Sequence, residues 1–124
     1  MSASTPKALI YHNTKCSKSN AALNLLHEHG LEVIVVNYLE TPLSAEAIAE
    51  LLVQLGFEAR QLIRFGEPIA IESGLSTNDL RDEQEWISWM VRHPVLIERP
   101  LIVIDKKAVI GRPAEAILPL IQAV

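Results

Sequence analysis

The sequence is short of several features, and each shortage excludes a class of protein. It has 124 residues and a single cysteine, so no disulfide can form within one chain and a small secreted domain framed by disulfides is excluded. Apolar runs such as 33–36 and 101–104 have the length of a strand, far below the roughly 18 residues of a membrane helix. Apolar residues make up 49% of the chain and charged residues 21%, which predicts a folded protein with a core of its own.

Positive charge is also in short supply. The 11 lysines and arginines face 15 aspartates and glutamates, which gives a formal net charge of −4 at pH 7. Such a balance does not favour general binding to nucleic acid or to an anionic membrane, so neither is expected as a partner. The first residues are polar and lack the apolar segment of a signal peptide. We therefore expect a cytoplasmic protein.

The pattern of apolar residues predicts the order of the elements. Buried strands are predicted at 8–11 and 33–36 with a helix over 17–29 between them, which makes a βαβ unit with parallel strands. A block of helices follows at 45–55, 58–63, 68–73 and 79–92. A hairpin with strands 101–104 and 108–110 and a last helix over 114–122 complete the chain.

This order predicts an α/β fold, a thioredoxin-like mixed four-stranded sheet with a helical insertion between the βαβ and ββα halves. We expect residues 1–124 to form a single domain, with the insertion at about 44–93.

Cys16 is the residue at which chemistry is expected. It lies at or just before the start of the helix 17–29, where free backbone N–H groups and the helix dipole stabilise a thiolate. Its pKa is therefore expected below the usual value of about 8.5, with help from Lys15 and Lys18. Ser17 and Ser19 can add hydroxyl donors. The same loop suits a tetrahedral oxyanion, with Ser17 and Lys18 as further contacts. The alternative is a buried cysteine that packs as a small apolar side chain.

Four other residues are candidates for the same site. His12 precedes Cys16 by four positions and is predicted to act on the thiol, as an imidazolium that lowers its pKa or as a neutral ring that accepts its proton. An ordinary loop histidine is the alternative. Arg64, Arg99 and Arg112 fall at predicted element boundaries, and guanidinium groups bind tetrahedral oxyanions. For each arginine the alternative is a surface ion pair. No spacing of histidine, cysteine and acidic residues indicates a metal site.

The loop that contains Cys16 is similar to that of a known protein family. The run Tyr11-His12-Asn13-Thr14-Lys15-Cys16-Ser17-Lys18-Ser19 resembles the active-site loop of the ArsC family, the glutaredoxin-dependent arsenate reductases. Three later segments match the family in the right order: Leu62-Ile63-Arg64, Glu98-Arg99-Pro100 and Ile110-Gly111-Arg112-Pro113. The resemblance covers residues 8–121 and is close to the YfgD-like subgroup through 16–19 and 38–42. Thr14 departs from the pattern, because many members have proline there.

The resemblance implies both an activity and its residues. The activity is reduction of arsenate to arsenite through a cysteine-arsenate thioester, with Cys16 as the nucleophile and His12 as the histidine that favours the thiolate. Arg64, Arg99 and Arg112 would hold the oxyanion. The implied partners are arsenate, glutathione as the reducing co-substrate, and glutaredoxin; no bound cofactor and no metal is expected. The single cysteine agrees with this, because the second thiol must then come from another molecule.

Two other functions stay open. Spx-like regulators share the fold and bind RNA polymerase, but they usually carry a Cys-x-x-Cys switch, and Ser19 stands at the second cysteine position here. A glutathione-linked thiol oxidoreductase with another substrate would also use one cysteine. Independently of function, the Arg99–Pro100 bond is expected to be cis, because this architecture often has such a proline ahead of a strand near the reactive thiol.

Overall fold

The computed structural model describes residues 7–13 and 16–122, and the chain divides into two compact units. The sheet unit consists of the described residues of Met1–Thr41 and Arg99–Val124, and the helical unit of Pro42–Glu98. The predicted insertion, residues 44–93, falls within the helical unit. That the two units form a single domain stays a prediction. Among the described residues, no helix is long and apolar enough to cross a membrane.

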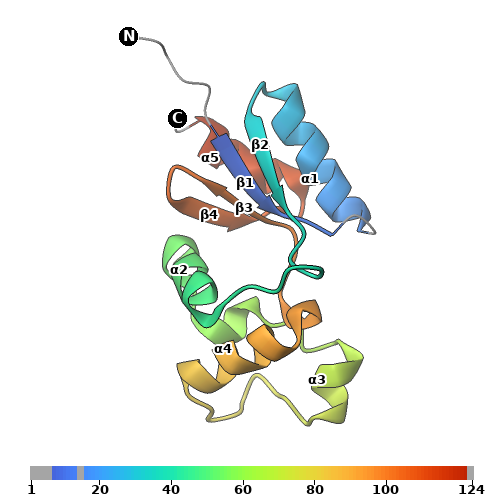
Figure 1. Ribbon diagram of the computed structural model, residues 1–124, viewed down its shortest axis with the longest axis vertical. Helices are drawn as coiled ribbons and strands as arrows, with labels where there is room; N and C mark the ends of the chain where they lie inside the picture. The colour runs from blue at the N-terminus through green and yellow to red at the C-terminus, as the bar shows by residue number, and fades with distance from the viewer. Residues whose placement is uncertain (1–6, 14–15, 123–124) are drawn as a thin grey trace. The chain divides into compact units, whose positions relative to one another are not determined.

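The sheet unit contains a four-stranded mixed sheet with the strand order β2-β1-β3-β4 (Figure 1). β1 (Lys7–Tyr11) runs parallel to β2 (Glu32–Val36), and α1 (Ser17–Glu28) connects them. β3 (Leu101–Ile104) is antiparallel to both β1 and β4 (Lys107–Ile110). The predicted fold class is therefore confirmed: an α/β, thioredoxin-like mixed four-stranded sheet, with helices inserted between its βαβ and ββα halves.

The core of the sheet unit lies between the sheet and its helices. Alternate side chains of β1 and β3 point to one face, because successive residues of a strand face opposite ways. α1, the 3-10 helix η3 (Ala114–Ile117) and α5 (Leu118–Gln122) pack apolar side chains against the same core. Its fully buried members are Ala8, Ile10, Ala22, Leu26, Ile102 and Ile117. This packing fixes where α1 begins, and so where Cys16 lies.

The prediction of a buried strand at 33–36 is wrong in one respect. β2 is an edge strand that pairs with β1 alone, and the side chains of Ile34 and Val35 are each 48% exposed. β-branched residues favour the extended backbone of any strand. Their presence therefore indicated a strand correctly but did not distinguish an edge strand from a central one.

The predicted hairpin has a tighter turn than expected. Asp105 and Lys106 join β3 to β4 with φ values of 51° and 63°. Positive φ at both central residues is typical of the type I′ turn, whose twist suits a two-residue hairpin. The second strand therefore begins at Lys107, one residue earlier than predicted.

The helical unit contains α2 (Ala45–Leu55), η1 (Ala59–Leu62), α3 (Pro68–Glu72), α4 (Glu83–Arg92) and η2 (Pro94–Leu96). Buried side chains from α2, η1, α4 and η2 form the interior of the helical unit: Ile48, Leu51, Leu62, Trp86, Met90 and Leu96. The elements occur in the predicted order.

The start of α4 differs from the prediction, which placed the helix over 79–92. α4 begins at Glu83, with Asp82 as the N-cap whose carboxylate accepts a hydrogen bond from the N–H of Glu85 at 2.8 Å. Asp79 instead accepts from the N–H of Ser76 at 3.1 Å. Aspartate is common both at N-caps and in turns. Asp79 and Asp82 were therefore both suitable N-caps for α4, and in the structure Asp82 is the N-cap.

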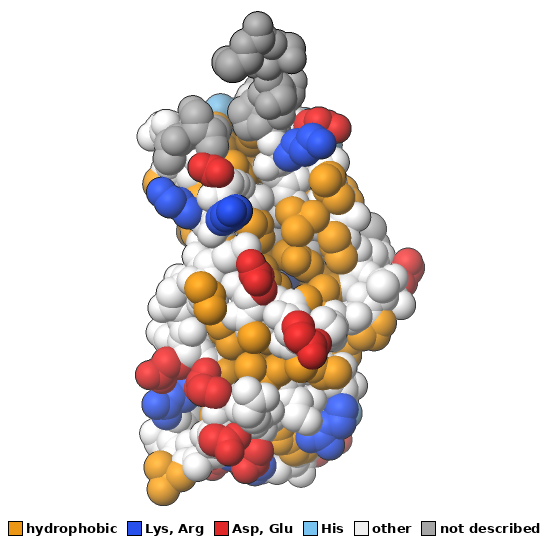
Figure 2. All heavy atoms as spheres, turned by 60° about the vertical axis from the view of Figure 1, so that its left-hand side comes forward, with side chains coloured by type: hydrophobic (Ala, Val, Ile, Leu, Met, Phe, Trp, Pro, Cys, Tyr) orange, Lys and Arg blue, Asp and Glu red, His pale blue; other side chains and the backbone are white. Residues whose placement is uncertain are grey.

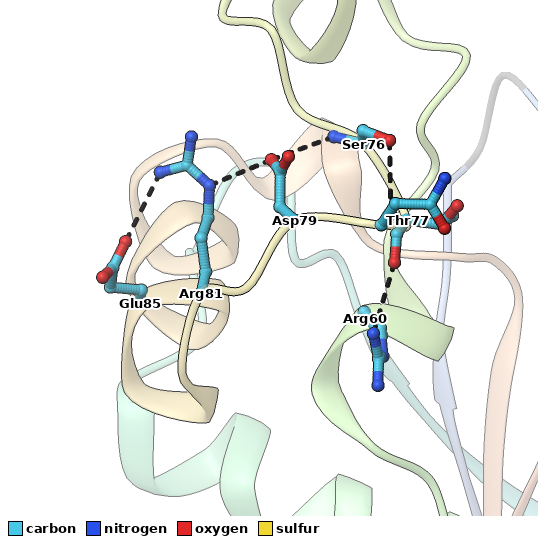
Figure 3. A network of polar contacts seen from close by, with 7 residues as sticks. Arg60, Ser76, Thr77, Asp79, Arg81 and Glu85 are labelled. Atoms are coloured by element: carbon cyan, nitrogen blue, oxygen red, sulfur yellow. Dashed lines mark hydrogen bonds and ion pairs between the residues drawn. The ribbon is translucent and has the colours of Figure 1, made fainter.

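Polar contacts of Arg81 fix the segment that leads into α4 (Figure 3). Its Nε donates to Asp79 at 3.2 Å and its Nη1 to Glu85 at 3.4 Å. The guanidinium carbon lies 5.7 Å from the ring centroid of Trp86 and 5.9 Å from that of Trp89, within the range of a cation–π contact. Both tryptophan rings therefore pack against the guanidinium of Arg81.

Candidate active site

Cys16 is the N-cap residue of α1, where the sequence placed it. Its N–H donates to the carbonyl of Asn13 at 3.0 Å, and its own carbonyl accepts from the N–H of Asn20 at 3.1 Å. The side chain is partly exposed. Cys16 is thus not packed as a core residue, and its sulfur lies among the free N–H groups of the first helical turn.

The surroundings of Cys16 lower its pKa. Burial raises the pKa of the thiol, but hydrogen bonds from the backbone N–H of Ser19, the side chain of Arg99 and the backbone N–H of Lys18 outweigh it. The positive charge of Arg99 lowers the pKa further. Each of these contacts favours the thiolate, because donors and cations stabilise the charged form. The net effect is a thiol that ionises more readily than an ordinary cysteine.

Arg99 lies two residues before the start of β3 and belongs to the sheet unit, as Cys16 does. Among the described arginines, it is the one whose hydrogen bond and charge act on the pKa of Cys16. The bond between Arg99 and Pro100 is cis, as expected, and the bond between Arg112 and Pro113, for which no cis bond was predicted, is cis as well.

Gly111 lies against Pro100 in a place where no side chain fits. Its N–H donates to the carbonyl of Pro100 at 2.9 Å. A Cβ at position 111 would lie 2.7 Å from Cδ1 of Ile102 and 3.2 Å from both Cγ of Pro100 and Cδ1 of Ile117. Glycine therefore permits the close approach that supports the residue next to Arg99.

His12 follows β1, and its backbone N–H donates to the carbonyl of Val36 at 2.8 Å. The residue is only 3% exposed, and burial lowers the pKa of its ring. Its Nδ1 has no hydrogen-bond partner among the described residues. A buried ring disfavours the imidazolium, so of the two predicted roles the neutral ring that accepts a proton fits this position better.

Ser17 and Lys18 occupy the first turn of α1 with exposed side chains. The backbone N–H of Lys18 is among the groups that lower the pKa of Cys16. The predicted contribution of Lys15 and the departure at Thr14 fall outside the described residues.

Ser19 was predicted only as a hydroxyl donor near Cys16 and not as an oxyanion contact. It is fully buried, and its Oγ accepts a hydrogen bond from the N–H of Asn13 at 3.3 Å. Its position in the first turn of a helix was the available signal, because that turn has free N–H groups. The burial of its hydroxyl was not evident from the sequence.

Arg64 and Arg112 are placed differently from Arg99. Arg112 is exposed beyond the end of β4. Arg64 belongs to the helical unit, where its Nη1 lies 3.1 Å from Oε2 of Glu67 and its Nε 3.4 Å from Oε1 of Glu98. For Arg64 the ion-pair alternative is therefore the arrangement observed, and an oxyanion-binding role stays a prediction for both arginines. Within 7–13 and 16–122, no cluster of three or more histidine, cysteine or acidic side chains suits a metal ion.

Comparison with known proteins identifies the family. The model of the ArsC family matches residues 11–120, a span that contains the cysteine loop and all three predicted arginines. The chain belongs to the ArsC family. It is 46% identical over 118 residues to the uncharacterized protein YfgD of Escherichia coli (strain K12), covering 94% of this chain and 98% of that protein.

Other ArsC relatives are named for an activity. An arsenate reductase of Neisseria meningitidis serogroup A is 39% identical over 113 residues, covering 90% of this chain and 96% of that protein. A solved structure described as arsenate reductase from Vibrio cholerae matches with a TM-score of 0.88 at 39% identity, covering 94% of this chain and 98% of that one. The resemblance stated from the cysteine loop and the two Arg-Pro segments is thus confirmed.

Proposed function

We propose that this chain reduces arsenate to arsenite with Cys16 as the nucleophile. The observation that carries the proposal is the thiol whose pKa is lowered by Arg99 and by the backbone N–H groups of Lys18 and Ser19. The thiolate is the reactive form of cysteine, and the same donors suit an oxyanion held next to it. Relatives named arsenate reductase, at 39% identity, support arsenate as the substrate.

The reaction needs two thiols and balances without a bound cofactor. The thiolate of Cys16 attacks arsenic(V); a sulfur–arsenic bond forms, an arsenic–oxygen bond breaks, and the oxygen leaves as water after taking up protons. Glutathione thiolate then attacks the sulfur of Cys16 in the resulting cysteine-arsenate thioester. The sulfur–arsenic electron pair stays on arsenic, arsenite leaves, and a disulfide between Cys16 and glutathione remains. Glutaredoxin reduces that disulfide, because this chain has no second thiol to do so.

The other predicted residues divide by how directly the geometry supports them. Arg99 both stabilises the thiolate and offers a guanidinium to the oxyanion, and Ser17 and Lys18 supply donors at the first turn of α1. His12, buried and neutral, accepts the thiol proton. Arg64 and Arg112 are assigned to the oxyanion by the family resemblance alone.

The test is a coupled assay with arsenate, glutathione and glutaredoxin, in which consumption of the nicotinamide reductant reports turnover. The native chain is expected to consume it, and Cys16→Ser is expected to lose turnover with an unchanged circular dichroism spectrum. Turnover that survives in Cys16→Ser would remove the mechanism. Activity toward a glutathionyl disulfide alone would indicate the thiol oxidoreductase, and capture of RNA polymerase without any reductase activity would indicate the regulator.

A further inference from the structure

Ser19 carries a hydroxyl into a fully buried position next to the candidate nucleophile. Its neighbours in the first turns of α1, Ser17, Lys18 and Asn20, are exposed, whereas Ser19 has no exposed surface. Buried polar groups are kept where they form hydrogen bonds, because an unsatisfied one costs free energy. The buried hydroxyl of Ser19 therefore needs a hydrogen-bond partner within the protein, and the N–H of Asn13 is such a partner.

Ser19 meets the cysteine loop at two points. Its backbone N–H is the foremost of the hydrogen-bond donors that stabilise the thiolate of Cys16. Its Oγ holds the N–H of Asn13 at 3.3 Å, and the carbonyl of Asn13 in turn accepts from the N–H of Cys16 at 3.0 Å. Cys16 is thus tied to Ser19 directly through its sulfur and indirectly through Asn13.

Ser19 also ties the loop to the first turn of α1. Its side chain reaches back to the loop, as the third residue of a helix does in a capping box, and accepts a hydrogen bond from the N–H of Asn13. The backbone N–H groups of Ser19 and Lys18 meanwhile favour the thiolate of Cys16, the N-cap residue.

We propose that Ser19 is a positioning residue, whose hydroxyl holds Asn13 and thereby keeps the sulfur of Cys16 in line with the N–H groups of Lys18 and Ser19 and with Arg99. This inference rests on the proposed function, in which the thiolate of Cys16 is the nucleophile. Ser19→Ala removes the hydroxyl and leaves a residue that favours the helix. The substitution therefore loosens the loop without weakening α1, and the sulfur moves out of line with its donors.

The test compares Ser19→Ala with Ser88→Ala, which makes the same chemical change at an exposed position of α4. The pH dependence of alkylation by iodoacetamide gives the pKa of Cys16, and amide hydrogen exchange followed by NMR reports the hydrogen bond of Asn13. In Ser19→Ala we expect the thiolate fraction at neutral pH to fall by about 3- to 10-fold, since each pKa unit is a factor of ten. The amide of Asn13 should exchange faster. Ser88→Ala should change neither.

Three results would overturn the proposal. Faster exchange at Asn13 with an unchanged thiol pKa would mean that the hydroxyl orders the loop without positioning the sulfur. Unchanged exchange would mean that the bond to Asn13 is not what the hydroxyl contributes. Ser19→Thr keeps an acceptor oxygen and should retain the native thiol pKa; a pKa raised as far as in Ser19→Ala would contradict the role of the oxygen.

Ser19→Thr also provides the comparison if Ser19→Ala unfolds. None of these readouts needs arsenate. If the thiol pKa and hydrogen exchange change as expected but the native chain does not turn over arsenate, the proposed function is contradicted and the positioning role of Ser19 is not.

Discussion

Three arginines of the helical unit and Arg99 of the sheet unit have opposite kinds of partner. In the helical unit, Arg60, Arg64 and Arg81 each have a nitrogen within 3.4 Å of a carboxylate oxygen. In the sheet unit, Arg99 directs a hydrogen bond and its charge at the sulfur of Cys16. A guanidinium paired with carboxylates is largely neutralised toward a third group, whereas one beside a thiol changes its chemistry.

This contrast separates a structural arginine from a functional one. Exposed ion pairs contribute little to stability, and Arg60 and its partner Glu58 have side chains 44% and 62% exposed. On the face drawn in Figure 2, acidic and basic side chains adjoin in some places, and other acidic side chains have no basic neighbour. The distinguishing feature of Arg99 is therefore its partner, a nucleophile in the same unit.

The largest effect is expected from breaking the contact between Arg99 and Cys16. Arg99→Gln removes the cation and its hydrogen bond, so the pKa of the thiol should rise and the thiolate at neutral pH should fall about tenfold. The rate of iodoacetamide alkylation against pH measures this. Arg60→Gln removes an arginine that already has a carboxylate partner and should leave the rate unchanged. Equal alkylation rates in Arg99→Gln and Arg60→Gln would contradict the distinction drawn between these two arginines.

A smaller effect is expected from crowding the support of Arg99. Gly111→Ala would press a methyl group against Ile102 and Pro100, and overpacking of this kind costs about 1–3 kcal/mol. Gly66→Ala, in the helical unit, places its methyl group where no heavy atom lies within 4 Å, and should change the free energy of unfolding by less than about 0.5 kcal/mol. Urea unfolding of both variants measures the difference. Equal stabilities would show that the packing around Pro100 yields easily.

Much of the fold could be predicted from the sequence because its signals are local. Apolar runs and helical spacing predicted the βαβ unit and the hairpin, and the position of Cys16 at the start of α1 followed from them. The edge position of β2 could not be predicted in this way, because strand order depends on pairing between distant segments. The start of α4 was misplaced because Asp79 and Asp82 are both suitable caps.

The candidate site was predictable to the same extent. The loop around Cys16 is a local feature, whereas the partner of each arginine is not. Three arginines at element boundaries looked alike in the sequence. Only the structure shows that Arg64 forms ion pairs with Glu67 and Glu98, whereas Arg99 lowers the pKa of Cys16. The burial of Ser19 likewise depends on packing that no neighbouring residue reveals.

The central claim is that the folded chain makes the thiol of Cys16 more acidic. The most direct measurement is the pH dependence of its alkylation in the native protein, compared with the same chain unfolded in urea, whose thiol has the ordinary pKa of about 8.5. The native midpoint is predicted to lie below the unfolded one. A native midpoint equal to or above it would contradict the account.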